Sequence, residues 1–422
     1  MPVEVNVGLV GLGNIGSGVL DILKENSEII EKRTGVRINL VAACDKSKEQ
    51  LEKAITLGIP TTENFKDLLN NEKIGVIIEL IGGYEPAHSI IIDALRAKKH
   101  VITANKAVLA KYGTEIFAEA QKNNVNVLFE AAVGGCIPII RTIEESYSSD
   151  RIEKIYGILN GTTNFILTRM GEGMSYEEAL KKAQELGFAE ADPSFDVEGK
   201  DTAQKLSILA GLAFDAKIGC EIFTEGITKI TKSDIDFAKE LGYVIKLLAI
   251  AKKENGQIEL RVHPTMIPAS HFFANISNEF NAVLLSGANT GEILLSGKGA
   301  GKLPTATVVV TDIIELGSRV RVTQRNFENV KIMPFEEVTS RFLLRLNVAD
   351  KPGILAEIAK SLGNNGISIA ALSQKETNME TVPIILITHK ASEGQLIKAI
   401  KEFESIKEIR EKASVLRIED FD

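Results

Sequence analysis

Cysteine is scarce in this chain, and Cys44, Cys136 and Cys220 are scattered without the spacing of a metal site or a disulfide framework. This usage is typical of a reducing compartment, so we expect a cytoplasmic protein. No apolar run approaches the ~18–20 residues that a membrane-spanning helix needs, and the first residues enter a strand pattern without a signal peptide. We therefore expect no association with a membrane.

Clusters of positive charge are also missing. The 49 Lys and Arg residues are interspersed among 57 Asp and Glu residues, which gives a formal net charge of -8 and a pI of about 5.5. This balance argues against nucleic acid as a partner and leaves a small molecule. A chain of 422 residues that is 44% hydrophobic can bury the cores of two or three domains.

The most informative stretch, residues 183–205, reads AQELGFAEADPSFDVEGKDTAQK. It predicts two helices, with Gly187 ending the first and Gly199 freeing the backbone before the second. Asp201 and Lys205 are four apart on the second helix, so they share a face with Cβ atoms about 5–6 Å apart. Burial and neighbouring carboxylates shift the proton affinity of a lysine, which suits proton transfer. An ordinary surface ion pair is the alternative.

An acidic connection joins these two helices. Its acidic residues are Glu190, Asp192 and Asp196, and Pro193 restricts its backbone conformation. The longer pattern resembles the signature of the homoserine dehydrogenase family. The positions that match in order and spacing are Ala183, Gly187, Asp192, Pro193, Asp196, Gly199, Asp201 and Lys205.

A glycine motif near the N-terminus predicts a dinucleotide site. Gly11, Gly13 and Gly16 follow a Val-rich strand and open an amphipathic helix, the context that a G-x-G-x-x-G motif requires. The first two glycines let the backbone turn and approach a pyrophosphate, the third allows close packing, and the helix start supplies free N–H groups. We place Asn14 and Ile15, inside the motif, in the same cofactor site. A glycine turn without a cofactor is the alternative.

The second strand, INLVAACD, ends at Asp45. An acid there can accept hydrogen bonds from ribose hydroxyls and so favours NAD, but Asp45 lies further from the glycines than the usual ~20 residues. Lys46 and Lys48 follow it and could neutralise the 2′-phosphate of NADP. The choice of cofactor stays open, and Asp45 as a helix or turn cap is the alternative.

Strands and helices continue to alternate through GVIIELIGG, HVITANKA and NVLFEAAVGG, which predicts a Rossmann-type, doubly wound parallel sheet. Ligands bind beyond the carboxyl ends of such strands, where Thr103 and Lys106 lie. The T-A-N-K run resembles the family's lysine that contacts both nicotinamide cofactor and substrate. A surface lysine is the alternative.

The run from Glu130 to Pro138, EAAVGGCIP, also resembles the family. The resemblance implies a monovalent cation, commonly sodium, at Glu130, Val133, Gly135 and Ile137. Carbonyl oxygens beside a carboxylate suit a hard cation, while a Gly-rich hinge between domains is the alternative.

The middle of the chain predicts an α+β domain. Asn255-Gly256 is a strong hairpin signal, and NAVLLSGAN and GEILLSG read as further strands. Asn160 to Asn164 resembles the family's substrate-side loop, with a helix N-cap as the alternative. Gly301 precedes a helix over about 303–322. The resemblance implies that this glycine loop contacts the cofactor and that the helix belongs to the cofactor domain.

The tail predicts a βαββαβ order. Asp350-Lys-Pro-Gly353 at its first strand–helix turn resembles an ACT domain. Such domains bind amino acids, and free N–H groups at a helix start suit a carboxylate. The resemblance makes threonine the suspected effector, and a module for oligomerisation alone is the alternative.

The expected domains are a Rossmann domain at 1–135 with 303–322, a substrate-binding and dimerisation domain at 136–302, a linker at 323–340 and an ACT domain at 341–422. The resemblance implies NADP- or NAD-dependent interconversion of L-homoserine and L-aspartate 4-semialdehyde, in threonine, methionine and isoleucine biosynthesis, by a homodimer or homotetramer.

The resemblance also implies roles for single residues. Lys205 would take the hydroxyl proton, Lys106 would stabilise negative charge on the oxygen, and Asp201 would orient Lys205 or a bridging water. Glu190 would bind the substrate's α-ammonium group with support from Asp196. The base could instead be Lys106.

Two other functions compete with this interpretation. A semialdehyde dehydrogenase acting through a thiohemiacetal would need a reactive cysteine, but Cys136 has no histidine nearby in sequence. A non-catalytic amino-acid sensor would have no reason to keep the acidic–lysine stretch.

Overall fold

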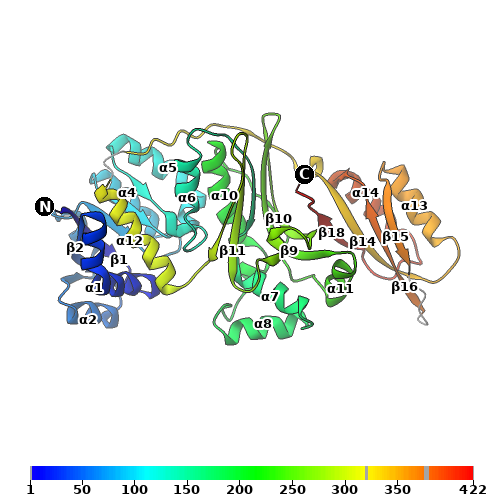
Figure 1. Cartoon of the computed structure of the whole chain (residues 1–422), viewed down its shortest axis with the longest axis horizontal. Helices are drawn as coiled ribbons and strands as arrows, with labels where there is room; N and C mark the ends of the chain where they lie inside the picture. The colour runs from blue at the N-terminus through cyan, green and yellow to red at the C-terminus, as the bar shows by residue number, and fades with distance from the viewer. Residues whose placement is uncertain (1, 319–321, 375–379, 422) are drawn as a thin grey trace. The chain divides into compact units, whose positions relative to one another are not determined.

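The computed structural model describes residues 2–318, 322–374 and 380–421 (Figure 1). The chain divides into two compact units. The first comprises Met1–Gly161, Asp201–Glu221 and Glu279–Val330, and the second comprises Thr162–Lys200, Ile222–Asn278 and Lys331–Asp422.

A parallel six-stranded sheet forms the centre of the first unit. Its strands in spatial order are β3 (Thr61–Thr62), β2 (Val36–Cys44), β1 (Val3–Val10), β4 (Val76–Glu79), β5 (His100–Thr103) and β6 (Val127–Leu128). The helices between them are α1 (Asn14–Thr34), α2 (Lys48–Thr56), α3 (Phe65–Leu69), α4 (Ala87–Arg96) and α5 (Lys106–Asn123). The strands read as apolar runs because helices cover such a sheet. The predicted Rossmann-type sheet is confirmed.

Helix α12 (Lys302–Ser318) comes from much later in the chain and packs against α1 (Figure 1). Ala306, Val309 and Ile313 are fully buried in the same core as Val7 and Val19. The prediction placed this helix over 303–322, and 319–321 lie outside the described residues.

A second, antiparallel group in the first unit consists of β7 (Ile152–Ile158), β11 (Phe280–Gly287) and β12 (Gly291–Lys298). Helix α10 (Lys200–Phe214) follows the acidic stretch. Before β7 the chain forms the 3-10 turn Glu130–Ala132, the short α6 (Ile139–Arg141) and a π-helical turn, Thr142–Ser146.

The second unit contains the predicted hairpin, β9 (Tyr243–Glu254) with β10 (Gln257–Pro268). Asn255 and Gly256 have φ of 50° and 77°, as a two-residue turn of the favoured hand requires. Its helices are α7 (Gly161–Gly171), α8 (Tyr176–Glu185), α9 (Ser194–Val197) and α11 (Lys232–Glu240), where α7 begins on the last residue of the first unit. Short strands β8 (Phe223–Thr224) and β13 (Lys331–Ile332) pair with β10.

The tail has the predicted βαββαβ order. Its elements are β14 (Thr339–Ala349), α13 (Ile354–Asn364), β15 (Ile369–Gln374), β16 (Thr381–Thr388), the short β17 (Ala391–Ser392), α14 (Glu393–Phe403) and β18 (Ser414–Ile418). The two helices contact each other, and the strands lie in the order β18-β14-β16-β15. Strand β18 also pairs in parallel with β10 through Thr265–Arg417. The tail sheet is therefore continuous with the hairpin.

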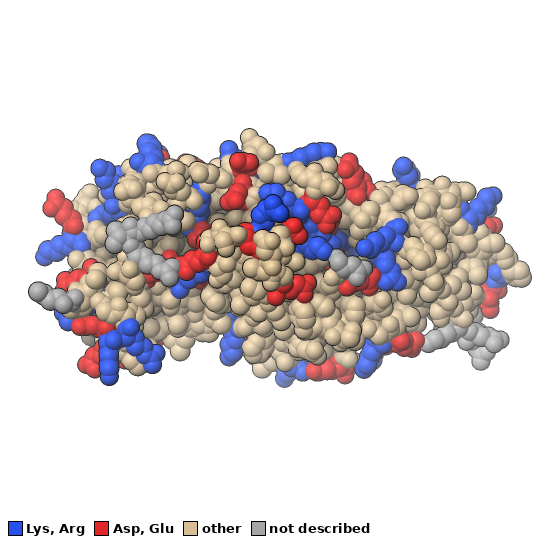
Figure 2. Space-filling model, turned by 45° about the horizontal axis from the view of Figure 1, so that its top comes forward, with Lys and Arg blue, Asp and Glu red and all other residues tan. Residues whose placement is uncertain are grey.

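Charged side chains of both signs are interspersed on the face shown in Figure 2. Among the described residues, every helix is too short or too polar to cross a membrane.

Candidate active site

The glycine loop between β1 and α1 is sterically restricted at two of its three glycines. A Cβ on Gly16 would lie 2.0 Å from the Gly11 carbonyl oxygen. Gly11 has φ of 96°, and a Cβ there would lie 2.8 Å from the backbone of Leu80. A Cβ on Gly13 would meet no atom within 4 Å. Open space over Gly13, beside the first N–H groups of α1 at Asn14 and Ile15, fits an approaching pyrophosphate.

Asp45 fixes this loop from the end of β2. Its Oδ2 accepts a hydrogen bond from Leu12 N at 2.6 Å, and its Oδ1 accepts from Ser47 N at 2.8 Å. Asp45 thus connects the glycine loop to the turn before α2, in agreement with the alternative that it caps a turn. Its contact with a ribose stays a prediction. Lys46 and Lys48 are both exposed.

The T-A-N-K run fixes the start of α5. Thr103 Oγ1 donates to the buried carboxylate of Glu79 at 2.7 Å and accepts from Asn105 N at 3.0 Å. Asn105 caps α5 and donates to Gly83 O at 2.7 Å. These bonds hold Lys106, the first residue of α5, at the carboxyl end of β5. Sequence reasoning missed Glu79, because a strand-end glutamate carries no motif of its own.

Asp201 forms ion pairs with both predicted lysines. Lys205 Nζ lies 2.6 Å from its Oδ2, and Lys106 Nζ lies 3.2 Å from its Oδ1. Asn160 Nδ2 also donates to Oδ2, at 2.9 Å. Burial alone would raise the pKa of Asp201, whose exposure is 3%, but the two lysine charges lower the pKa to about 2. Asp201 is therefore an anion that holds two ammonium groups together.

Lys205 is positioned by a second bond, from its Nζ to Leu159 O at 2.7 Å. An ammonium group has three N–H bonds, and the contacts with Asp201 and Leu159 use two of them. The third can be offered to an oxygen of a bound molecule. With Lys106 beside it, the site can exchange a proton with such an oxygen and stabilise negative charge on it.

Glu190 and Asp196, the predicted substrate ligands, belong to the second unit. Glu190 is exposed. Thr162 Oγ1 donates to Phe188 O at 2.6 Å and contacts Asp196 Oδ2 at 3.2 Å. These bonds hold Asp196 at the start of α7.

Asn164 has a structural environment in the second unit. Its Oδ1 accepts from Lys246 Nζ at 3.0 Å, and its Nδ2 donates to Ile276 O at 3.1 Å. The Asn160–Asn164 run is therefore used in two ways: Asn160 contacts Asp201, while Asn164 packs inside the second unit.

Because Lys246 is buried, the unfolding free energy of the protein should rise at alkaline pH. Burial lowers its pKa to about 8, so between pH 8 and pH 10 the unfolded chain binds a proton that the folded chain has released. The unfolding free energy should then rise by about 1–2 kcal/mol over this range relative to Lys246→Met. Urea unfolding of both proteins at pH 8 and pH 10 measures this, and an identical pH dependence would contradict it.

In the predicted cation loop, each oxygen of the Glu130 carboxylate accepts one backbone hydrogen bond. Glu130 Oε1 accepts from Ile140 N at 2.7 Å and Oε2 accepts from Arg141 N at 2.9 Å. Burial raises the pKa of Glu130 to about 7 despite these bonds. Arg141 also bonds Asp312 at 2.6 Å, where burial raises the pKa of Asp312 well above its ordinary value.

A cation at this loop would depend mainly on main-chain oxygens, with Val133, Gly135 and Ile137 as the predicted donors. Gly135 has φ of 61°, and its Cβ would lie 2.5 Å from Gly299, so the loop folds tightly against the residues before α12. Within the described residues no group of three or more His, Cys, Asp or Glu side chains is placed to hold a metal. The sodium site stays a prediction.

The loop before α12 holds Gly301, with φ of 135°, a value suited to glycine. Cys136 N and Sγ both donate to Lys298 O, at 3.2 and 3.3 Å. This brings the 133–137 and 298–301 loops together. Contact of Gly301 with a cofactor stays a prediction.

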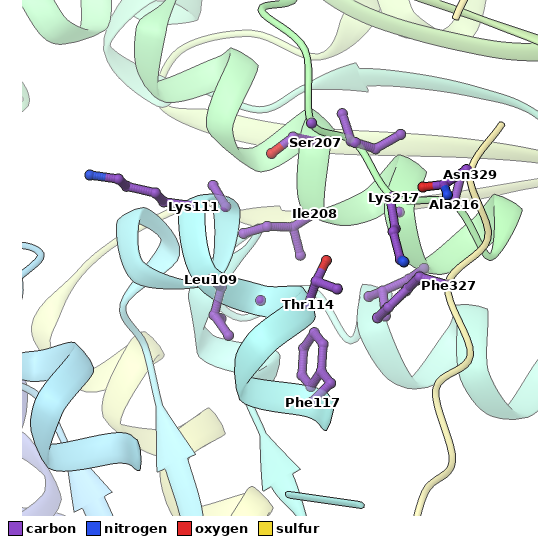
Figure 3. Close-up of a pocket in the computed structure, with 16 residues that line it drawn as sticks. Leu109, Lys111, Thr114, Phe117, Ser207, Ile208, Ala216, Lys217, Phe327 and Asn329 are labelled. Carbon is purple, nitrogen blue, oxygen red and sulfur yellow. The ribbon is translucent and has the colours of Figure 1, made fainter. Parts of the chain in front are cut away.

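A hollow of about 360 Å³ lies between α5 and α10, further along the helices that carry Lys106 and Lys205 (Figure 3). Leu109, Thr114 and Phe117 line it from α5, and Ser207 and Ile208 from α10. None of the predicted site residues lines it, so it is separate from the lysine pair.

Comparisons with known proteins match three parts of the chain. Residues 11–130 match the family "Homoserine dehydrogenase, NAD binding domain", residues 138–314 match "Homoserine dehydrogenase", and residues 342–408 match "ACT domain". A homoserine dehydrogenase of Neisseria gonorrhoeae is 41% identical over 429 residues, with 98% of each chain covered.

Solved structures agree with these matches. The structure of a homoserine dehydrogenase from Thiobacillus denitrificans has a TM-score of 0.94 at 42% identity and covers 99% of both chains. A hyperthermophilic archaeal homoserine dehydrogenase in complex with NADPH has a TM-score of 0.62 at 27% identity, covering 74% of this chain and 97% of that one.

Proposed function

The chain belongs to the homoserine dehydrogenase family, and from this premise we propose that it interconverts L-homoserine and L-aspartate 4-semialdehyde with a nicotinamide cofactor. The observation that carries the proposal is the pairing of Lys205 and Lys106 on one buried aspartate, Asp201. A pair of ammonium groups around one anion suits a reaction in which charge appears on a substrate oxygen.

The residues have distinct roles in this proposal. When bound, the nicotinamide ring supplies or accepts the hydride. In the direction of reduction, Lys205 gives a proton to the carbonyl oxygen as negative charge develops there, and Lys106 stabilises that charge. In oxidation the neutral amine form of Lys205 takes the hydroxyl proton and becomes the ammonium form. Glu190 binds the substrate's α-ammonium group, and Asp196 supports it.

The NAD-binding family match supports a nicotinamide cofactor, and we propose the glycine loop, Thr103, Lys106 and Gly301 as its site. The exposed Lys46 and Lys48 favour NADP, since Asp45 already accepts two backbone hydrogen bonds. One relative in complex with NADPH is consistent with this preference. We also propose a sodium ion at the 130–137 loop, where each Glu130 oxygen keeps an acceptor position beside its one backbone hydrogen bond.

The ACT match supports regulation by an amino acid, with threonine as the proposed effector in threonine, methionine and isoleucine biosynthesis. We also propose a homodimer or homotetramer located in the cytoplasm. Threonine that changes neither the rate nor the melting temperature would remove the effector proposal.

The test of the activity is nicotinamide absorbance at 340 nm on adding L-homoserine, with NAD and NADP in parallel. We expect a signal with both the wild type and Cys136→Ala. Loss of turnover in Cys136→Ala would favour the thiohemiacetal mechanism. Cofactor binding without any homoserine-dependent signal would contradict the proposed substrate.

A further inference from the structure

A fully buried carboxamide in the first unit has no hydrogen-bond partner among the described residues. Asn281 is the second residue of β11 and has an exposure of 0%. Within the parts of the chain that the structure describes, neither its Nδ2 nor its Oδ1 forms a hydrogen bond. Burying an unpaired amide costs free energy, and most buried polar side chains in folded proteins are paired. The side chain is therefore expected to serve a bound molecule.

The pairing of β11 with β7 places Asn281 beside the lysine pair. Ala282 pairs with Ile158 in the antiparallel register, so Asn281 runs next to Leu159, the residue that follows Ile158. The Leu159 carbonyl accepts the hydrogen bond that holds Lys205 Nζ, at 2.7 Å. Asn281 is thus one strand away from the backbone atom that positions Lys205.

The Asn281 amide also lies against the glycine loop before α12. A Cβ on Gly299 would lie 2.2 Å from both Cγ and Nδ2 of Asn281, and 2.4 Å from its Oδ1. Any side chain at residue 299 would overlap the amide, which packs directly on the main chain two residues before Gly301. Gly301 belongs to the proposed cofactor site. The amide therefore lies between the cofactor loop and the strand that holds Lys205.

The chemistry of the amide restricts its partner. A carboxylate would accept from Nδ2 and leave Oδ1 unpaired, whereas a cation would contact Oδ1 and leave Nδ2 unpaired. A second carboxamide has an acceptor and a donor in one plane and satisfies both atoms. The nicotinamide ring of the proposed cofactor carries such a group.

We propose that Asn281 binds the carboxamide of the nicotinamide ring and so fixes the orientation of the ring beside Lys205. This inference rests on the proposed function for the identity of the cofactor, but it does not depend on which alcohol is oxidised. Asn281 is then a cofactor-binding residue that determines specificity for the carboxamide.

An unpaired buried amide should make the cofactor-free protein no more stable than an apolar variant of the same shape. Asn281→Leu removes both polar atoms and keeps a side chain of similar volume. Its melting temperature without cofactor should equal or exceed that of the wild type, because no hydrogen bond is lost and no amide is buried unpaired. Thermal unfolding therefore separates a loss of cofactor contact from a loss of folding.

Calorimetric titration of the full-length protein with NADP, NAD and their 3-acetylpyridine analogues, in which a methyl group replaces the amide NH₂, measures the contact. We expect the wild type to bind its preferred dinucleotide about 10-fold more tightly than the analogue, the size of one buried hydrogen bond. Asn281→Leu should bind the dinucleotide about 10-fold more weakly than the wild type and no longer distinguish it from the analogue. The corresponding ADP-ribose fragment, which lacks nicotinamide, should bind both proteins equally.

Asn289→Leu is the matched control. Asn289 is exposed in the turn that joins β11 to β12, where its Nδ2 donates to Asp150 at 2.8 Å. This variant should bind all the ligands like the wild type.

Three outcomes would overturn the contact. Equal affinity of the wild type for the dinucleotide and its analogue would do so without any variant, as would undiminished affinity in Asn281→Leu or no binding of either dinucleotide by the wild type. Turnover of L-homoserine is measured on the same samples. Absent turnover with binding that depends on Asn281 would reject the proposed reaction and keep the contact, and normal turnover with equal affinities would do the reverse.

Discussion

Lys205→Ala should slow homoserine oxidation by about 100-fold or more, the size expected for removing a general acid or base. Lys205 is held by Asp201 and by the Leu159 carbonyl, so its ammonium group is fixed before substrate arrives. The loss should appear mainly in kcat, because the interaction strengthens as charge develops on the substrate oxygen. Steady-state rates with saturating cofactor, from pH 7 to pH 10, measure it.

Lys106→Ala, with Lys122→Ala as its control, separates the roles of Lys106 and Lys205. Lys122 is on α5 with Lys106, but its side chain is 73% exposed, so Lys122→Ala should retain wild-type rates. If Lys205 exchanges the proton, Lys205→Ala should lower kcat more than Lys106→Ala does. The opposite pattern would assign the proton to Lys106, and wild-type rates in Lys205→Ala would contradict the mechanism.

The core of this site could be predicted because local geometry determines it. Asp201 and Lys205 are one helical turn apart, and their contact follows from helix spacing alone. Lys106 follows a strand end, where parallel sheets place ligand-binding residues. Its meeting with Asp201 depends on tertiary packing between α5 and α10, which no local pattern contains.

Other parts of the site depend on backbone atoms and could not be predicted from residue types. The Leu159 carbonyl holds Lys205, yet any residue at that position would supply the same oxygen. A cation at Glu130 stays a prediction, and residue types did not indicate that its two oxygens accept the N–H groups of Ile140 and Arg141. These two donors belong to the short α6, which is followed by a π-helical turn.

Gly16→Ala and Gly13→Ala should both impair the cofactor site, but for different reasons. A Cβ at residue 16 would overlap the Gly11 carbonyl oxygen, so Gly16→Ala should lower the unfolding free energy by about 1–3 kcal/mol and abolish measurable cofactor binding. Gly13 has an extended backbone that alanine can adopt, and its Cβ would point into open space. Gly13→Ala should therefore keep its melting temperature.

The cofactor should nevertheless bind Gly13→Ala more weakly by about 10-fold or more, because the added methyl occupies the path of the pyrophosphate. Gly75→Ala, where the nearest atom to a Cβ is 4.0 Å away, is the control for a glycine substitution in the same unit. Thermal unfolding and the emission of bound NADPH or NADH measure both quantities, and the chain's lack of Trp keeps the protein background low. Undiminished affinity in Gly13→Ala would mean that the phosphates bind away from the start of α1.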